Sequence, residues 1–291
     1  RYIVKRHPHI VKDVFDCAIS YHGQSPERLL NLIYRIHSRK KAVWIHGEMS
    51  FPEDQCRRME KYYRKMDQYF FVSTPTKNAF IQKISIDPQK TTVYYNRLNG
   101  QEILEKSQEA MEDVFSEETV NLLTVGRVSA EKGQDMIPKI VRELNDKGYD
   151  VRWYVIGDGP SLDRLKGLIQ KENVSDRVVL LGVKNNPYPY MKACDIYVQP
   201  SYTEGYSTTI CEAGILGKAI IGTKPSGGIR DQIENGESGL IVDASVEGLE
   251  QGIIRLLEDS LLRQKFEQNI LKKDFEGKGE IRKFINYIED K

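Results

Sequence analysis

The sequence predicts two α/β domains, each built on a parallel sheet that helices cover on both faces. Short apolar runs typical of strands alternate with amphipathic stretches typical of helices along most of the chain. This alternation favours doubly wound parallel sheets over hairpins. A length of 291 residues accommodates one large or two ordinary domains. A polar, acidic segment at residues 101–118 divides the strand signals into two groups and is the expected linker.

Ten apolar runs carry the strand signal, four before the linker and six after it. In order, the expected strands are residues 16–20, 42–45, 69–72, 92–95, 122–125, 151–156, 178–181, 196–198, 219–222 and 240–242. Amphipathic helices are expected between most of them, for instance at 134–147 and 162–171. The segment 276–291 indicates a charged amphipathic helix with Ile281, Phe284, Ile285 and Ile288 on one face. The expected domains are 1–115 and 116–271, followed by a C-terminal segment at 272–291.

Composition is that of a soluble globular protein. Hydrophobic residues make up 40% of the chain and charged residues 29%. No run approaches the roughly 20 apolar residues of a membrane span, and no leader-like segment opens the sequence. The four cysteines are scattered without metal-ligand spacing, which indicates reduced thiols: Cys17, Cys56, Cys194 and Cys211. A cytoplasmic protein is therefore expected.

The near-neutral net charge of +1 hides an asymmetry between the two halves of the chain. Residues 1–100 contain 18 Lys and Arg against 9 Asp and Glu, whereas the remainder contains 25 against 33. The positive charge is concentrated at 35–41 and 57–65. Such a surface attracts anionic membrane headgroups or polyprenyl diphosphates, unless it is simply a solvated helix face. Nucleic acid is not expected as a partner, because no recognition motif accompanies the charge.

The segment from Glu204 to Glu212 is the strongest candidate for a functional site. Two carboxylates lie eight residues apart, around a Gly and a Ser-Thr-Thr cluster, just after the apolar run at 196–198. Ser207 is expected to cap a helix that runs to about Leu216, so that its first amides and positive dipole end suit a phosphate. Taken alone, the segment also fits an ordinary capped helix with surface acids.

Four segments in order resemble the retaining glycosyltransferases of family 4, which have the GT-B fold. The segment around Glu204 and Glu212 resembles the family's E-x7-E signature, and residues 126–133 resemble its G-R-x4-K-G loop. Residues 155–160 resemble its G-x-G-P turn, and residues 227–242 its Gly-Gly turn and closing strand. Residues 157–162 alone are a weak signal and do not form the G-x-G-x-x-G of dinucleotide binding. The resemblance implies two Rossmann-like domains that face a cleft, and a C-terminal helix at 272–291 that crosses back to the first domain.

The resemblance also implies roles for charged residues. Arg127 and Lys132 would hold the donor diphosphate and stabilise the charge that grows as the glycosidic bond breaks. The alternative for Arg127 is a surface ion pair with Glu131. Glu204 would contact the donor sugar, and Glu212 would accept hydrogen bonds from the ribose as a positioning group.

Further positions carry over from the same motifs. The loop at Gly205, Tyr206, Ser207 and Thr208 would bind the distal phosphate, while Gly227 and Gly228 would let the backbone approach the diphosphate. The alternative for the Gly pair is an ordinary tight turn. Val183, which follows an expected strand, would hold the nucleobase through its backbone. His46, followed by Gly47, matches a His-Gly that touches the donor sugar or its phosphate, although a single His at a strand end is often structural.

The resemblance implies a metal-independent hexosyltransferase that retains anomeric configuration without a protein nucleophile. No D-x-D occurs in the chain, and cationic side chains together with a helix N-terminus would stabilise the diphosphate instead of a metal. The implied donor is a UDP-sugar, the implied acceptor a polysaccharide or lipid-linked glycan, and no cofactor is expected. A non-catalytic nucleotide-sugar-binding subunit and a protein-O-glycosylating enzyme of the same family remain as alternatives.

The resemblance covers the second domain fully and the first domain only in its latter half. Four strand signals precede the linker, and the family's opening strand and Gly-rich loop have no counterpart. About three strands, or roughly 80–100 residues at the usual length of a βα unit, are therefore expected to be lacking from the first domain.

Overall fold

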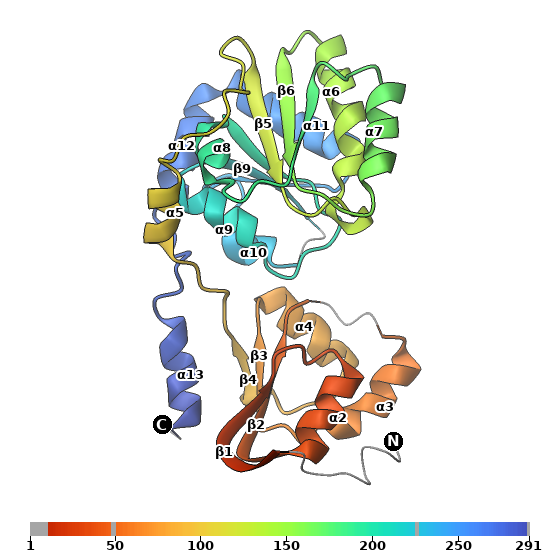
Figure 1. The fold of residues 1–291 in the computed structure, drawn as a ribbon, viewed down its shortest axis with the longest axis vertical. Helices are drawn as coiled ribbons and strands as arrows, with labels where there is room; N and C mark the ends of the chain where they lie inside the picture. Colours follow the sequence, from red (N-terminus) through yellow and green to blue (C-terminus); the bar gives the residue numbers. More distant parts are fainter. Residues whose placement is uncertain (1–10, 48–50, 225–226, 290–291) are drawn as a thin grey trace. The chain divides into compact units, whose positions relative to one another are not determined.

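The computed structural model describes residues 11–47, 51–224 and 227–289. The chain divides into two compact units, of which unit 1 combines Arg1–Arg97 with Gly277–Lys291 and unit 2 is Leu98–Glu276. Figure 1 shows a sheet with flanking helices in each unit. Within the described residues, no helix is long and apolar enough to cross a membrane.

Unit 2 contains a six-stranded parallel sheet in the order β10-β9-β8-β5-β6-β7. Its strands are β5 (Val120–Val125), β6 (Val151–Ile156), β7 (Val178–Gly182), β8 (Ile196–Gln199), β9 (Ala219–Thr223) and β10 (Leu240–Val242). The chain adds β6 and β7 on one side of β5 and then returns to add β8, β9 and β10 on the other side. The strand order therefore reverses between β5 and β8, where Leu122 pairs with Ile196.

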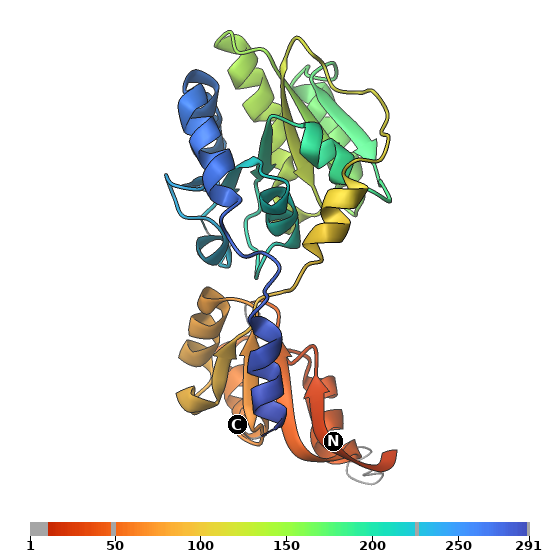
Figure 2. The same cartoon turned by 90° about the vertical axis from the view of Figure 1, so that its left-hand side faces the viewer.

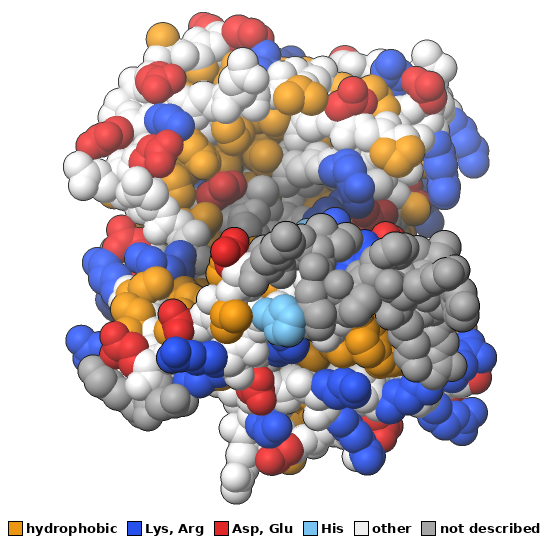
Figure 3. Space-filling view, turned by 60° about the horizontal axis from the view of Figure 1, so that its bottom comes forward, with side chains coloured by type: hydrophobic (Ala, Val, Ile, Leu, Met, Phe, Trp, Pro, Cys, Tyr) orange, Lys and Arg blue, Asp and Glu red, His pale blue; other side chains and the backbone are white. Residues whose placement is uncertain are grey.

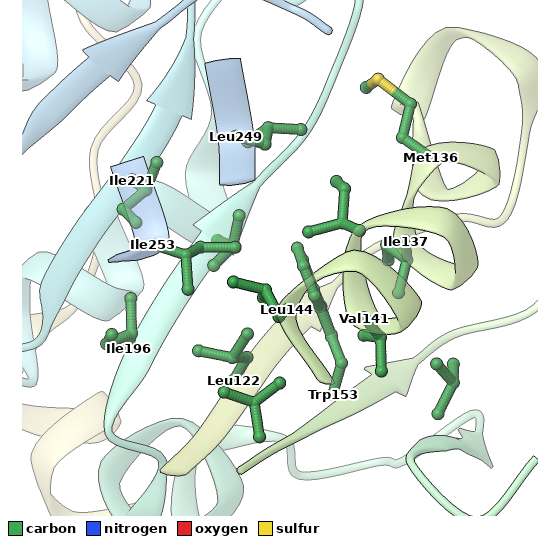
Figure 4. Packing of buried hydrophobic residues seen from close by; sticks show 14 of the residues in the cluster. Leu122, Met136, Ile137, Val141, Leu144, Trp153, Ile196, Ile221, Leu249 and Ile253 are labelled. Atoms are coloured by element: carbon green, nitrogen blue, oxygen red, sulfur yellow. The ribbon is translucent and has the colours of Figure 1, made fainter. Parts of the chain in front are cut away.

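Helices cover both faces of this sheet. They are α5 (Gly100–Lys106), α6 (Ile137–Asp146), α7 (Leu162–Lys171), α8 (Tyr188–Ala193), α9 (Thr208–Ile215), α10 (Ile229–Gln232), α11 (Val246–Glu258) and α12 (Ser260–Ile270). The main core lies between one face of the sheet and helices α6, α7, α11 and α12. At its centre, the buried Trp153 of β6 lies beside Val141 and Leu144 of α6 (Figure 4). The alternation along β6 turns Tyr154 to the opposite face, where its ring contacts Phe115.

Unit 1 contains a four-stranded parallel sheet in the order β1-β2-β3-β4. Its strands are β1 (Val11–Ser20), β2 (Ile36–Ile45), β3 (Gln68–Phe71) and β4 (Thr91–Val93), and its helices are α2 (Pro26–Arg35), α3 (Glu53–Tyr63), α4 (Thr74–Lys83) and α13 (Glu280–Ile288). One face packs on α2, α3 and α4 through a buried cluster that includes Leu29, Tyr63 and Phe80.

The other face of this sheet carries aromatic rings that pack against α13. Trp44 and Phe70 lie with their ring centroids 5.0 Å apart, and Phe284 of α13 lies 5.7 Å from Phe70. Lys40 of β2 donates hydrogen bonds to the backbone oxygens of Tyr287 and Ile288, so its ammonium lies at the negative end of the helix dipole. Helix α13 lies beside the sheet of unit 1 in both cartoon views (Figures 1 and 2).

All ten predicted strands are present, and their order along the chain is confirmed. The predicted apolar face of the C-terminal helix was wrong in part, because Ile281 and Ile285 are 40% and 42% exposed. The packing face is rotated toward Phe284 and Tyr287, and the helix begins at Glu280, whose carboxylate accepts the Tyr95 backbone amide at 3.0 Å.

The expected linker is not irregular throughout. Its first part forms α5, capped by Asn99, whose side chain accepts the Glu102 amide. The helix packs on α8 and α9, and Asn186 donates to the Lys106 backbone oxygen at 2.8 Å. These contacts assign residues 98–115 to unit 2, so the compact units divide between Arg97 and Leu98, whereas the sequence placed the boundary at residue 115.

Candidate active site

The loops that carry the sequence motifs meet where the strand order of unit 2 reverses. Open parallel sheets bind ligands outside the carboxyl ends of their strands at this reversal point, because the loops on its two sides diverge there and leave a crevice. Here the loop after β5 carries Arg127 and Lys132, and the loop after β8 carries Glu204 and Ser207. Adjacent strands β5 and β8 thus bring together two segments that lie more than 70 residues apart.

Lys132 and Glu204 form the central contact of this region. The Lys132 ammonium donates to a Glu204 carboxylate oxygen at 2.6 Å, and the two side chains are 21% and 14% exposed. Lys132 ends a single 3-10 turn (Ala130–Lys132). The next residue, Gly133, has φ +69°, and a Cβ there would approach the Pro200 carbonyl oxygen to 2.1 Å. Only glycine therefore fits between the two loops, which fixes Lys132 beside the loop of Glu204.

Arg127 takes a different position in the unliganded protein. Its guanidinium pairs with the Glu131 carboxylate, four residues further along the same loop, and 65% of its side chain is exposed. This is the surface ion pair that the sequence left open as the alternative. Hydrogen bonds from Ser129 and from the Glu131 backbone lower the pKa of Glu131, and the pair with Arg127 lowers it further. The role of Arg127 in diphosphate binding stays a prediction, and it requires the side chain to leave Glu131.

Helix α9 begins as the sequence predicted. Ser207 is its N-cap, with extended backbone (φ −80°, ψ 114°), and its hydroxyl accepts the Ile210 amide at 3.4 Å. The helix ends at Ile215 and is capped by Leu216. Amides at the start of a helix have no intrahelical acceptor and carry partial positive charge. Thr208 is exposed at this end, so the first turn of α9 can accept an anion.

Glu212 lies in the second turn of α9 and is partly desolvated. Burial raises the pKa of its carboxyl to about 7, and a hydrogen bond from Tyr188 lowers it slightly against that trend. The Tyr188 hydroxyl donates to a Glu212 carboxylate oxygen at 3.3 Å. Burial also raises the pKa of Tyr188 to about 12, with Glu212 as the second cause. Tyr188 therefore remains a neutral donor at physiological pH.

The Gly pair closes over the loop of Glu204. The Gly228 amide approaches the Glu204 backbone oxygen at 3.4 Å, and a Cβ on Gly228 would meet the Gly205 carbonyl oxygen at 2.2 Å. Gly227 precedes it in the same turn, and Tyr206 is buried. The observed reason for glycine at position 228 is thus close packing of two protein loops, while an approach to the diphosphate stays a prediction.

Two further predicted residues follow other strands, Val183 in unit 2 and His46 in unit 1. Val183 follows β7 and is 69% exposed; β7 is two strands from β5, about 10 Å away at the usual strand spacing. His46 belongs to unit 1, where it follows β2. Its ring lies 5.1 Å from that of Tyr21 and 5.6 Å from that of His22. Burial, followed by the neighbouring His22, lowers the pKa of His46 and favours the neutral imidazole.

Sequence reasoning missed the buried side chains that hold Ser207 and Glu212 in place. Gln199, Thr209 and Gln232 form buried hydrogen bonds around Ser207, and Tyr188 contacts Glu212. The one available signal was the polar Gln199 at the end of the apolar run 196–198, where a buried strand would ordinarily continue with an apolar residue.

Comparison with known proteins places this geometry in a family. The family model described as glycosyl transferases group 1 matches residues 105–273. The N-acetylgalactosamine-N,N'-diacetylbacillosaminyl-diphospho-undecaprenol 4-alpha-N-acetylgalactosaminyltransferase of Campylobacter jejuni is 30% identical over 205 residues, which cover 70% of this chain and 54% of that protein. An uncharacterized glycosyltransferase of Methanocaldococcus jannaschii is 26% identical over 233 residues, covering 74% and 57% respectively. The chain thus spans about half the length of these curated relatives.

Solved structures show the same architecture. Anabaena HepE in complex with UDP superimposes with a TM-score of 0.82 at 19% identity, covering 95% of this chain and 79% of that one. TarM of S. aureus gives 0.76 at 16% identity, covering 94% and 54%. Both similarities are too distant to transfer ligands, but they agree with the GT-B fold that the sequence predicted. The motif loops, the strand order and the matched family model together show that this chain belongs to the group 1 glycosyl transferases.

Proposed function

We propose that this chain belongs to a retaining hexosyltransferase that takes a sugar from a UDP-sugar and transfers it to a polysaccharide or lipid-linked glycan. The observation that carries the proposal is the 2.6 Å contact between Lys132 and Glu204 at the reversal point of the unit 2 sheet. It brings a cation for a diphosphate and a carboxylate for a sugar hydroxyl to the place where open α/β sheets bind ligands.

The proposed chemistry needs positioning and charge stabilisation, with no protein nucleophile. Lys132, joined by Arg127 after it leaves Glu131, would stabilise the negative charge that develops on the departing diphosphate. The first amides of α9 would hold the distal phosphate, and Glu212 would fix the ribose. These groups supply the electrostatic work that a divalent cation performs in other enzymes, so we propose a metal-independent reaction.

Donor binding would replace the contact between Lys132 and Glu204. Each of these charges neutralises the other. Because both side chains are largely buried, either charge would be costly if it were left without a partner of opposite charge. The donor offers both, because its diphosphate can take the ammonium and its sugar hydroxyls can donate to the carboxylate. The pair would thus keep the site charge-balanced before the substrate arrives.

The first experiment is a thermal-shift screen with UDP-, GDP-, ADP- and dTDP-sugars, since specific binding raises the melting temperature. We expect UDP-sugars to stabilise the protein and Lys132→Ala to remove that effect. Lys139→Ala is the matched control, because Lys139 is a surface lysine on α6 that pairs with Glu143 at 3.7 Å. Stabilisation by none of the nucleotides would contradict the proposal.

Activity then separates the enzyme from a binding subunit. Hydrolysis of the UDP-sugar that binds, or transfer to an added acceptor, would support the catalytic proposal. Tight binding with no turnover under any condition would favour the non-catalytic alternative. We propose His46 as a further contact to the donor sugar or its phosphate, where its neutral imidazole can donate one hydrogen bond and accept another. His46→Ala should therefore lower turnover with the intact donor. UDP affinity should stay unchanged if the contact is to the sugar and should fall if it is to the phosphate.

We further propose a peripheral position on the inner face of the membrane, through cations of α3 and the two residues after its end. Exposed cations follow one another there: Arg57, Arg58, Lys61, Arg64 and Lys65. Figure 3 shows Lys and Arg side chains, with Asp and Glu among them, on the part of the surface that it views. Two are partly neutralised, because Arg58 pairs with Asp54 and Arg64 with Glu60. The run at 35–41 contributes less, since Lys40 and Lys41 bond to backbone oxygens within unit 1.

Vesicle binding tests the membrane proposal. The protein should bind anionic vesicles at low salt and dissociate as salt approaches physiological concentration. Reversing the charge of Arg57, Arg58 and Lys65 together should abolish binding. Reversing Lys139, Lys166 and Lys171 on unit 2 provides the control with the same change in net charge. Absence of binding at low salt would show that these cations form an ordinary solvated face.

A further inference from the structure

The side-chain amide of Gln232 forms hydrogen bonds with both the backbone amide and the backbone carbonyl oxygen of Ser207. Gln232 is fully buried at the end of α10. Its oxygen accepts the Ser207 amide at 3.2 Å, and its nitrogen donates to the Ser207 carbonyl oxygen at 2.5 Å and to Cys211 Sγ at 2.9 Å. Both N–H groups of the amide are therefore used. The side chain accepts from and donates to the backbone of one residue, as the backbone of a neighbouring strand does in a sheet.

A second buried amide holds the same turn from the sheet. Gln199, the last residue of β8, is 2% exposed. Its oxygen accepts from the Thr209 hydroxyl at 3.0 Å and from the Tyr197 hydroxyl at 3.0 Å, and its nitrogen donates to Ser201 Oγ at 2.7 Å. Thr209 in turn lies 3.0 Å from the hydroxyl of Ser207. The first turn of α9 is thus bonded to β8 as well as to α10.

We infer that Gln232 and Gln199 are positioning residues that preset the first turn of α9 to receive the distal phosphate of the donor. The inference rests on the proposed function, because it concerns the phosphate end of that same site. Neither amide reaches the exposed end of the helix, so neither touches the ligand. Their contribution is to fix the direction in which the helix amides point before the nucleotide binds.

The arrangement also decides which groups remain for the phosphate. The Ser207 amide is committed to Gln232, and the Ser207 hydroxyl is committed to Ile210 and Thr209. The donors left at this end are the amides of Thr208 and Thr209 and the exposed hydroxyl of Thr208. Ser207 therefore acts as the cap that orients these groups, rather than as a phosphate ligand itself.

The test compares the affinities for UDP and UMP in a variant that lacks the hydrogen bonds between Gln232 and Ser207. Gln232→Met keeps the length and burial of the side chain but removes the acceptor of the Ser207 amide and one of the two donors to the Ser207 carbonyl oxygen, which still accepts the Cys211 amide at 3.4 Å, so the turn is expected to relax. UDP, which carries the distal phosphate, should bind at least about tenfold more weakly, since a relaxed turn no longer aims the first amides of α9 at that charged group. UMP, which lacks that phosphate, should bind within about twofold of wild type.

Two controls make the test independent of overall stability. Ile253→Val removes one methyl group from the buried core of unit 2, far along the chain from the site, and should lower the melting temperature without separating UDP from UMP. Thr209→Val keeps the shape of the side chain but breaks its bonds to Gln199 and Ser207. It should reproduce the UDP-selective loss in a smaller degree, and it serves if Gln232→Met does not fold.

The outcomes distinguish this inference from the proposed function. If wild-type protein binds neither UDP nor any other nucleoside diphosphate, the proposed function fails, whatever the variants do. If wild type binds UDP and both variants bind it as tightly, the positioning role is overturned. An equal loss for UDP and UMP also overturns it, because a merely structural role would affect both ligands alike.

Discussion

The affinity for UDP should rise with pH through about 7, because Glu212 must lose a proton to hold the ribose. Burial raises the pKa of this carboxyl to about 7 in the free protein. A carboxylate that accepts two ribose hydroxyls is ionised in the complex, so binding below pH 7 first requires release of the proton. Affinity should therefore be about tenfold weaker at pH 6 than at pH 8, where the carboxyl is already ionised.

The groups around Glu212 support this titration. Tyr188 donates to the carboxylate from α8, and the buried Tyr197 of β8 and Cys211 of α9 lie close enough for the Glu212 charge to raise their pKa values. Among the described residues, burial and Tyr188 set the pKa of Glu212, and no cation contributes. Tyr188→Phe removes the one hydrogen bond that favours the charged form. The midpoint should consequently move to higher pH, with UDP affinity lowered at pH 7 and little changed at pH 9.

Calorimetry in buffers of different ionisation enthalpy measures the released proton directly. We expect about 0.9 proton released per UDP at pH 6 and about 0.1 at pH 8. The phosphate of UDP itself titrates near pH 6, so the same series on Glu212→Gln serves as the reference. Only the difference between the two proteins belongs to Glu212. Identical proton release by wild type and Glu212→Gln would refute the reasoning.

Three other predictions concern the same unit. Lys132→Ala or Arg127→Ala should weaken UDP binding by about 1.5–3 kcal/mol, the usual contribution of a charge-assisted hydrogen bond. The smaller loss is expected at the exposed Arg127. Unchanged affinity in both variants would contradict their role in binding the diphosphate. Glu204→Ala should leave UDP affinity nearly intact and lower kcat with the intact donor, whereas a loss of UDP affinity equal to that of Glu212→Ala would show that the two carboxylates do not divide their roles. The fragment 98–276 has its own core and should melt cooperatively and bind UDP; a non-cooperative melt would show that it depends on the rest of the chain.

The strands were predictable because their cores are apolar and buried, and the structure shows why their limits were not. β1 begins at Val11 and β2 at Ile36, five and six residues before the expected starts. These first halves carry polar and charged residues, and exposed side chains occur in both, among them Val14 at 70%, His37 and Arg39, so no apolar run marks them. α5 was read as linker because it is a single short helix that begins at Gly100 after Asn99, a pair that usually indicates a turn.

The candidate site was predictable as far as its motifs reach. Lys132 and Glu204 each follow a buried strand, and parallel topology brings the ends of adjacent strands to one edge, so their contact follows from the sequence. The hydrogen bonds between Gln232 and Ser207 could not be predicted from the sequence, because a glutamine has no preferred partner type and its burial depends on how α10 folds back. The partial burial of Glu212 was missed for a similar reason: α8 and Tyr188, which help to cover it, lie in a segment without a motif.

The packing of α13 against unit 1 has a consequence for synthesis. Unit 2 is one continuous stretch of chain, whereas the aromatic face of unit 1 is covered, among the described residues, by the helix at residues 280–288. On the ribosome, residues 11–97 therefore wait for residues 280–288 before they can bury Trp44 and Phe70, while unit 2 can already fold. This reverses the usual order in which N-terminal domains fold first. During that interval the nascent protein exposes an apolar sheet face, which is the surface that chaperones bind and that a stalled or prematurely terminated chain would leave uncovered.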